Sequence, residues 1–304
     1  MSNRSITVSS AIAEKHVDLL VVALGFEERG RFVAENGPDS DTRLAFAFPT
    51  VSTLSYEENR LALERLSYEI LPLSDDFGAA LVDAIEGLDS SRPRIGIDIS
   101  SLTRVHLAEI IDALVYSCSK EVSVDFLYAP ARSDAWEVDD GPIRVAEPVH
   151  PSFSAWADDA GLPLSAIIGV GVEESMALGA AEFLDVSNAY AFVPTNGDVG
   201  FDAMNEKANH DFFLAEYMSK KISYSIQEPF DLFTRLEGLV YGLSPRVRIA
   251  LVPLGPKIFA LCSLLVSLIA ENRATVWRFS ASANSTPVQR RPSGRIVSLR
   301  VKIA

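Results

Sequence analysis

Two loops in the first half of the chain carry residues that could bind or transform a ligand. One is Gly25-Phe26-Glu27-Glu28-Arg29, and the other is Asp98-Ile99-Ser100-Ser101-Leu102-Thr103-Arg104. Hydroxyl groups and backbone amides ahead of an expected helix suit a bound anion, because the first amides of a helix lack internal partners and its dipole favours negative charge. The same dipole opposes a cation in the first turn by about 0.3–1 kcal/mol. We therefore expect something anionic beside Arg104.

The pattern returns in the second half of the chain. Gly171-Val172-Glu173-Glu174 repeats the first loop, and Gly255-Pro256-Lys257 ends where the second loop ends, with Lys257 in the place of Arg104. Apolar segments around these loops also repeat in order, since residues 44–50 return as 189–195 and residues 94–97 as 248–251. The sequence thus predicts an internal duplication, with two related sites or one site shared between the halves.

Each half is predicted to alternate strands with helices. The expected strands are residues 18–24, 43–48, 68–73, 94–99 and 122–128 in the first half, and 165–170, 188–193, 221–226, 247–252 and 274–279 in the second. Their continuous apolar runs are typical of strands buried on both faces, and the segments between them have helical spacing. One helix is expected to start at Ser55, with Glu58 as its capping-box partner. The predicted fold is α/β, with two tandem Rossmann-like units, each a mainly parallel five-stranded sheet with helices on both faces.

A chain of 304 residues suits two cores rather than one. The predicted boundaries are unit one at residues 1–140, a linker at 141–163, unit two at 164–285, and a basic strand or tail at 286–304. This last segment contains five basic residues and no acid. It is expected either to lie as a strand against an acidic neighbour or to contact a phosphate or a partner.

In an open parallel sheet, ligands bind beyond the carboxyl ends of the strands, where the strand order reverses. The first and fourth strands commonly flank that point, so the two loops of a unit are expected to face each other. The candidate ligand-binding residues are Gly25, Phe26, Glu27, Glu28, Arg29, Asp98, Ser100, Ser101, Thr103, Arg104, Gly171, Glu173, Glu174, Gly255 and Lys257. The structural alternative is that the glutamates form salt bridges to Arg104 and Lys257 and only hold the loops together.

No cofactor, metal site or catalytic residue is predicted. The four histidines have no metal-ligand spacing, and Gly169-Val170-Gly171 is too short for a dinucleotide-binding fingerprint. Asp98 could act as a general base, but Val252 stands at the corresponding place in the second half.

Composition narrows the class of protein further. A net charge of −14 makes general nucleic-acid binding unfavourable, because an acidic body repels the phosphate backbone. The longest apolar run, residues 258–270, is shorter than the roughly 20 residues that span a membrane. No secretory signal pattern is found at the N-terminus, and the two cysteines lie in apolar helical segments. We expect a cytoplasmic protein that does not enter a membrane.

The tandem arrangement resembles the CARF ligand-sensing fold and the SAVED domain, which is a fused pair of such units. The likeness rests on Asp98-Ile99-Ser100-Ser101-Leu102-Thr103-Arg104, and also on Gly255-Pro256-Lys257 with the apolar helix that follows. The resemblance implies binding of cyclic oligonucleotides in bacterial antiviral defence. The second half departs from the pattern because it lacks the Ser/Ser/Thr set, and no effector domain is recognised. If the chain is a sensor, the effector is expected to be another polypeptide.

Three functions are open at this point. The first is a pseudo-symmetric sensor for a nucleotide-like anionic small molecule, acting with a separate effector. The second is an enzyme that hydrolyses a glycosidic bond of a nucleoside or nucleotide with Glu27, Glu28 or Asp98, since paired carboxylates can serve as acid and base. The third is a protein-interaction subunit whose loops bind no small molecule. Self-association is compatible with each, and the sequence favours binding over catalysis.

Overall fold

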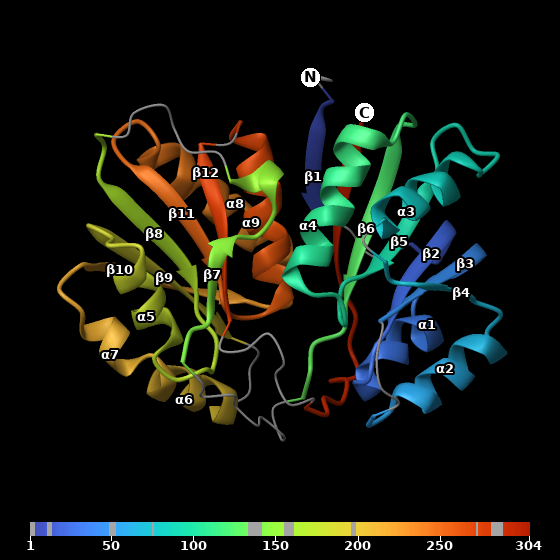
Figure 1. Cartoon of the computed structure of the whole chain (residues 1–304), viewed down its shortest axis with the longest axis horizontal. Coiled ribbons are helices and arrows are strands. Elements are labelled where there is room, and N and C mark those ends of the chain that lie inside the picture. The colour runs from blue at the N-terminus through green and yellow to red at the C-terminus, as the bar shows by residue number, and fades with distance from the viewer. Residues whose placement is uncertain are drawn as a thin grey trace. The chain divides into compact units, whose positions relative to one another are not determined.

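The chain folds into two compact units in a computed structural model that describes residues 4–10, 14–48, 53–74, 76–132, 142–154, 161–195, 199–271, 273–280 and 288–304 (Figure 1). Unit one consists of Met1–Ala135 together with Pro287–Ala304, and unit two is Trp136–Thr286. The C-terminal segment, which the sequence set apart as a strand or tail, is therefore a part of unit one.

Unit one is built on a seven-stranded sheet with the order β1-β13-β6-β5-β2-β3-β4. Its strands are β1 (Ile6–Ser10), β2 (His16–Leu24), β3 (Asp39–Ala47), β4 (Glu69–Pro72), β5 (Arg94–Asp98), β6 (Val122–Tyr128) and β13 (Val297–Ile303). The five strands from β6 to β4 are parallel, whereas β13 is antiparallel to both β6 and β1. Numbered along the chain, the parallel strands lie in the order 3-2-1-4-5.

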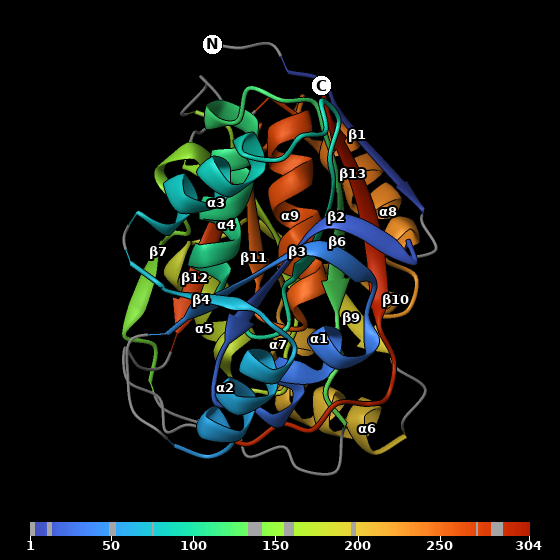
Figure 2. The ribbon, with the colours of Figure 1, turned by 90° about the vertical axis from the view of Figure 1, so that its right-hand side faces the viewer.

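Helices cover both faces of this sheet, as Figures 1 and 2 show. They are η1 (Glu28–Arg31), α1 (Phe32–Asn36), α2 (Tyr56–Arg65), α3 (Phe77–Glu86), α4 (Arg104–Asp112) and η2 (Ala113–Ser117). Val22 and Leu24 of β2 belong to a buried cluster with Val33 of α1 and Leu63 of α2. The alternation of side chains along a strand thus places one set of apolar residues under these two helices.

Unit two has a six-stranded sheet with the order β10-β9-β8-β11-β12-β7. Its strands are β7 (Val145–Pro148), β8 (Leu164–Gly169), β9 (Asn188–Thr195), β10 (Met218–Ser225), β11 (Arg248–Pro253) and β12 (Ala274–Ser280). All pairs are parallel except β12 with β7. The parallel strands again lie in the order 3-2-1-4-5, so the two units share one topology.

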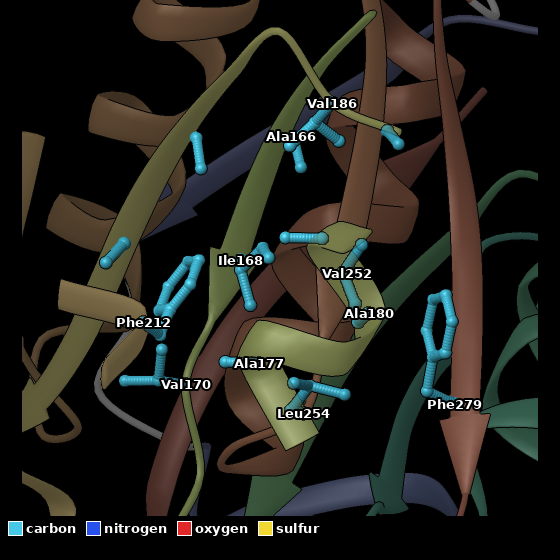
Figure 3. Close-up of a cluster of buried hydrophobic side chains, with 14 of the residues drawn as sticks. Ala166, Ile168, Val170, Ala177, Ala180, Val186, Phe212, Val252, Leu254 and Phe279 are labelled. Carbon is cyan, nitrogen blue, oxygen red and sulfur yellow. The ribbon is translucent and has the colours of Figure 1, made fainter. Parts of the chain in front are cut away.

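Apolar side chains from strands and helices form the core of unit two (Figure 3). Its helices are η4 (Pro151–Phe153), α5 (Met176–Phe183), α6 (Val199–Ala208), α7 (His210–Leu214), α8 (Pro229–Leu243) and α9 (Lys257–Ile269). Ile168 of β8 and Val252 of β11 meet Ala177 of α5 in one cluster. On α9, ten consecutive residues from Ile258 to Ser267 are buried, which agrees with a core helix.

The two-unit α/β fold is confirmed, whereas the prediction of five strands in each sheet is wrong. The extra strands are β1 and β13 in unit one and β7 in unit two, and β7 lies within the predicted linker. All three are antiparallel to their neighbours, so each extends a core of five parallel strands.

Strand β13 is held in the sheet by apolar burial and by an ion pair. Leu299 and Val301 are fully buried, with exposed fractions of 0%. Arg300 donates two hydrogen bonds, at 2.6 and 2.7 Å, to the carboxylate of Asp125 on β6, and it also contacts Glu14 at 3.0 Å. Asp125 is buried, so this pairing offsets the cost of placing a carboxylate in the interior. Part of the basic C-terminal segment therefore meets acidic neighbours within unit one.

The predicted capping box at Ser55 does not form. Helix α2 begins after Ser55 as expected, but the Ser55 side chain makes no capping hydrogen bond. Its hydroxyl accepts a hydrogen bond of 2.7 Å from the side-chain amide of Gln289 instead. Gln289, which is far away in the sequence, thus takes the place of the expected local partner Glu58.

Truncation of Leu299 tests the role of β13 in the core of unit one. We expect Leu299→Ala to lower the free energy of unfolding by about 2–5 kcal/mol, because it leaves a cavity in a fully buried position. Leu61→Ala, at a half-exposed position of α2 in the same unit, should change it by about 0.5 kcal/mol or less. Urea unfolding of both variants measures the difference, and equal losses would show that β13 is not a part of the core.

Candidate functional site

In both units the predicted loops follow the two strands that flank the reversal of strand order. In unit one these strands are β2 and β5, and in unit two they are β8 and β11. The predicted residues of the first half belong to unit one and those of the second half to unit two. The topology therefore places each set where parallel α/β sheets bind ligands.

The two loops of unit one meet at Gly25 and Ser101. A Cβ atom added at Gly25 would lie 3.3 Å from the Cβ of Ser101, and one added at Gly30 would lie 3.0 Å from its Oγ. The absence of side chains at these glycines therefore lets the first loop close against the second. The Ser101 hydroxyl is shielded from solvent and makes no hydrogen bond with the described residues.

Asp98 and Ser100 form a tight polar turn at the end of β5. Both residues are buried, and one carboxylate oxygen of Asp98 accepts hydrogen bonds from the Ser100 backbone amide at 2.8 Å and hydroxyl at 2.5 Å. The Ser100 oxygen accepts in turn from the backbone amide of Ala129 at 2.8 Å. These two predicted ligand-binding residues hold the second loop to the end of β6 in this structure.

Thr103 and Arg104 begin helix α4. The Thr103 hydroxyl caps the helix by accepting from the His106 backbone amide at 3.2 Å, and it also lies 2.9 Å from the His106 ring nitrogen Nδ1. The His106 ring packs between Phe48 and Phe77, with centroid distances of 5.2 and 5.4 Å. Arg104 is the first residue of the helix and lies in its first turn, as expected. His106 joins the candidate site, although its sequence context gave no sign of it.

Glu27 and Arg29 pair with each other inside the first loop. Arg29 is 2% exposed, and its guanidinium contacts the Glu27 carboxylate, the Ala129 carbonyl oxygen at 3.2 Å and the Tyr128 ring. Burial alone lowers the pKa of this guanidinium, but the charge of Glu27 and the contact with Tyr128 outweigh it, so the pKa lies above its ordinary value. Arg29 is therefore a fixed cation that joins the first loop to the end of β6.

The backbone of the first loop is also held at Phe26 and Glu28. The carbonyl oxygen of Phe26 accepts from the Ser55 amide at 3.0 Å. The Glu28 amide donates to the Gln289 side chain at 2.8 Å, and the Glu28 carboxylate lies 3.4 Å from the Arg291 guanidinium. The loop thus contacts both helix α2 and the C-terminal segment.

Asn59 is a site residue that the sequence analysis missed. It is 1% exposed on helix α2, and its side-chain amide donates to the carbonyl oxygens of Gly25 at 2.9 Å and Glu27 at 2.8 Å. Its own oxygen accepts from Arg31 at 2.9 Å. Asn59 thus satisfies two carbonyl groups of the turn that follows the first parallel strand.

Unit two has the same arrangement at Asn205. This residue is 0% exposed on helix α6, and its amide donates to the carbonyl oxygen of Gly171 at 3.2 Å, while Asn209 donates to the same oxygen at 2.8 Å. Asn59 follows Gly25 by 34 residues, and Asn205 follows Gly171 by 34 residues. This equal spacing is readable in the sequence and could have revealed both asparagines.

The loops of unit two lie close together through backbone contacts. The amides of Leu254 and Gly255 donate to the carbonyl oxygen of Gly169 at 2.9 and 2.8 Å. A Cβ at Gly255 would overlap the carbonyl oxygen of Val170, so the second loop can take this path only with glycine there.

The remaining predicted residues of unit two lie around this contact. The carboxylate of Glu173 lies against Gly171, so that a Cβ added at Gly171 would overlap it. Glu174 is exposed, and Lys257 is the first residue of α9. Unit two thus keeps the cation at the start of the helix but has no counterpart of the Ser100 and Ser101 hydroxyls.

In unit one, the start of helix α4 has features that favour an anion. Helix α4 directs its first amides toward the carboxyl edge of the sheet, where Ser101 and Arg104 also lie. Within the described part of the chain, no group of three or more His, Cys, Asp or Glu residues could hold a metal ion. Cys118 and Cys262 are buried, and burial raises the pKa of both thiols, which keeps them protonated near neutral pH.

A comparison with protein-family models and with curated proteins finds no match for this sequence. Among the described residues, no helix has both the length and the apolar character needed to cross a membrane. The site is therefore interpreted from its own geometry.

Replacing Asn59 by aspartate tests its hold on the first loop. Asn59→Asp replaces the amide group that donates to the carbonyl oxygens of Gly25 and Glu27 with a carboxylate oxygen, which cannot donate. We expect the free energy of unfolding to fall by about 2 kcal/mol or more. Asn36→Asp is the control, because its amide donates to the Phe32 carbonyl at an exposed position. Urea unfolding at neutral pH should show a loss of about 0.5 kcal/mol or less for the control. Similar losses for the two variants would contradict the proposed hold.

Proposed function

We propose that this chain is a ligand-binding sensor for a nucleotide-like anionic small molecule, which binds at the carboxyl edge of the sheet in unit one. The observation that carries the proposal is the convergence of Gly25, Ser101 and the start of helix α4 on one edge of that sheet. The amino end of α4 favours an anion such as a phosphate group, because the helix dipole is positive there. Arg104, the first residue of α4, adds positive charge to the same turn.

The shielded hydroxyl of Ser101 supports a polar ligand at the same place. A hydroxyl without a hydrogen-bond partner in the described part of the protein can donate to a phosphate or a ribose oxygen. The loop that carries Gly25 and Gly30 covers this hydroxyl, so the contact requires that loop to move away from Ser101. The ligand that we propose thus meets a cation, a hydroxyl and the amino end of a helix.

The difference between the units favours unit one as the binding unit. The second loop of unit two lacks the hydroxyls and lies against the backbone of Gly169 and Val170. We therefore propose a pseudo-symmetric protein in which one unit binds the ligand and the other retains the topology with a reduced loop.

The contacts of the glutamates support binding rather than glycosidic hydrolysis. Glu27 is engaged with Arg29, and Glu28 lies near Arg291 and the C-terminal segment. A general acid and a nucleophile need two carboxylates that face one bond of the substrate. The resemblance to CARF and SAVED domains extends the proposal to cyclic oligonucleotides, to a role in antiviral defence in the cytoplasm, and to a separate effector protein.

Binding measurements on an Arg104 variant test the proposed function. Isothermal titration and thermal unfolding would be run with inorganic phosphate, ATP, cyclic dinucleotides and cyclic oligoadenylates as probes. We expect at least one nucleotide to bind and raise the melting temperature, and Arg104→Ala to weaken its binding by about tenfold or more, since hydrogen bonds to charged groups contribute about 1.5–3 kcal/mol.

Arg92→Ala is the matched control for this experiment. Arg92 precedes β5 at the amino edge of the same sheet, where its exposed side chain pairs with Glu121. The control should bind like the unchanged protein. The proposal is wrong if no probe binds or if both variants lose binding equally, and mass spectrometry of the incubated nucleotides would reveal a hydrolysed product if the chain were an enzyme.

A further inference from the structure

Residues 289–293 of the C-terminal segment cross the first loop of unit one. The side chain of Gln289 makes two contacts, since it accepts from the Glu28 amide at 2.8 Å and donates to the Ser55 hydroxyl at 2.7 Å. The Arg29 amide donates to the carbonyl oxygen of Arg290 at 3.1 Å. One short segment therefore holds both the loop and the start of helix α2.

The same segment is bound on its other side to the chain that follows β6. The Arg132 amide donates to the carbonyl oxygen of Arg291 at 2.9 Å, and the Ser293 amide donates to that of Pro130 at 2.8 Å. Ala131 and Pro292 form an isolated antiparallel bridge. Residues 289–293 thus connect the ends of β2 and β6, which are separated in the sheet by β5.

This short segment and strand β13 are held by different means. In β13, Val297, Leu299, Val301 and Ile303 are buried, and seven residues pair with β6. In residues 289–293, Arg291 and Ser293 are exposed, and Gln289, Arg290 and Pro292 are half-buried. Hydrogen bonds with little apolar burial are the kind that open locally, whereas buried strands open with the whole unit.

We propose that residues 289–293 form a reversible latch on the loop after β2, with Gln289 as its central contact. The latch opens as one piece while β13 stays in the sheet. Opening releases the amides of Glu28 and Arg29 together and frees the loop that carries Gly25 to move relative to Ser101. The latch thus controls the conformation of the loop at the candidate site. Its opening does not depend on which ligand binds there.

Charge supports the reversibility of this contact. The one ion pair found between the latch and the loop in the described residues joins Glu28 and Arg291 at 3.4 Å, and the Arg291 side chain is 62% exposed. Exposed pairs of this kind contribute little to stability and are screened by salt. The two side-chain hydrogen bonds of Gln289 are therefore the side-chain contacts whose removal is expected to weaken the latch most.

Hydrogen exchange of the full chain, read at single-amide resolution by mass spectrometry or NMR, tests the proposal without any ligand. The amides to follow are those of Glu28, Arg29, Arg132 and Ser293, with the amides of β13 as the reference. In the unchanged protein, we expect the four latch amides to become exposed together, in one opening event. This event should occur at least ten times as often as the opening that exposes the amides of β13.

Gln289→Ala identifies the central contact. We expect the four latch amides to exchange roughly tenfold faster in this variant, because it removes two hydrogen bonds, while the amides of β13 keep their rates. Gln227→Ala, an exposed glutamine in unit two, should leave all of these rates unchanged.

Two results would overturn the latch. One is that the four amides of the unchanged protein exchange no faster than those of β13, since the segment would then be a fixed part of the sheet. The other is that Gln289→Ala accelerates only the Glu28 amide, since the contacts would then open independently. If Gln289→Ala does not fold, the comparison in the unchanged protein still decides the first point. Ser55→Ala then decides the second, because it removes only the hydrogen bond between Gln289 and Ser55 and is expected to accelerate all four amides by a smaller factor. Loss of nucleotide binding in Arg104→Ala is a separate observation, so failure of the latch and failure of the proposed function are distinguishable.

Discussion

The loop after the first parallel strand depends on one requirement, namely that its buried carbonyl groups find donors once the chain has left the sheet. Backbone polar groups without partners are costly in the interior, and the sheet cannot supply donors beyond the end of its strand. Asn59 donates to Gly25 and Glu27 in unit one, and Asn205 and Asn209 donate to Gly171 in unit two. The helix after the second strand thus fixes the position of the first loop, and through Gly25 and Ser101 it fixes the shape of the candidate site.

In both units, asparagine side chains hold the first loop in this way, whereas the second loops of the two units differ. In unit one, Asp98 and Ser100 shape the second loop by side-chain hydrogen bonds, which leaves Ser101 beside Gly25. In unit two, the amides of Leu254 and Gly255 bind the carbonyl of Gly169 directly, so no polar side chain is needed there. The arrangement in unit one places serine hydroxyl groups at the edge of the sheet. In unit two, backbone amide and carbonyl groups lie at the corresponding place.

Elements with a clear local pattern can be predicted from the sequence, whereas the distant partner that an element pairs with cannot. Continuous apolar runs such as those in β2 and β8 identify the parallel strands, because strands buried on both faces need them. Strand β1, with its short and mixed pattern, gives no such signal, since its place depends on pairing with β13 nearly 300 residues later. The capping box at Ser55 fails for the same reason, because Gln289 takes the Ser55 hydroxyl. In the candidate site, Arg104 and Thr103 could be placed from sequence at the start of α4, whereas the partners of Glu27 and Glu28 could not.

The order of the chain adds a constraint on unit one, because its strand β13 follows all of unit two in the sequence. Strand β13 lies between β1 and β6, so the sheet of unit one is complete only when the last residues of the chain have joined it. Asp125 on β6 is buried and is paired by Arg300 from β13, so an unfinished unit one would leave this carboxylate without that partner. The loop of the candidate site meets the same segment through Gln289 and Arg290. The loop of the candidate site, which comes from the first third of the sequence, is therefore held in part by residues that follow all of unit two.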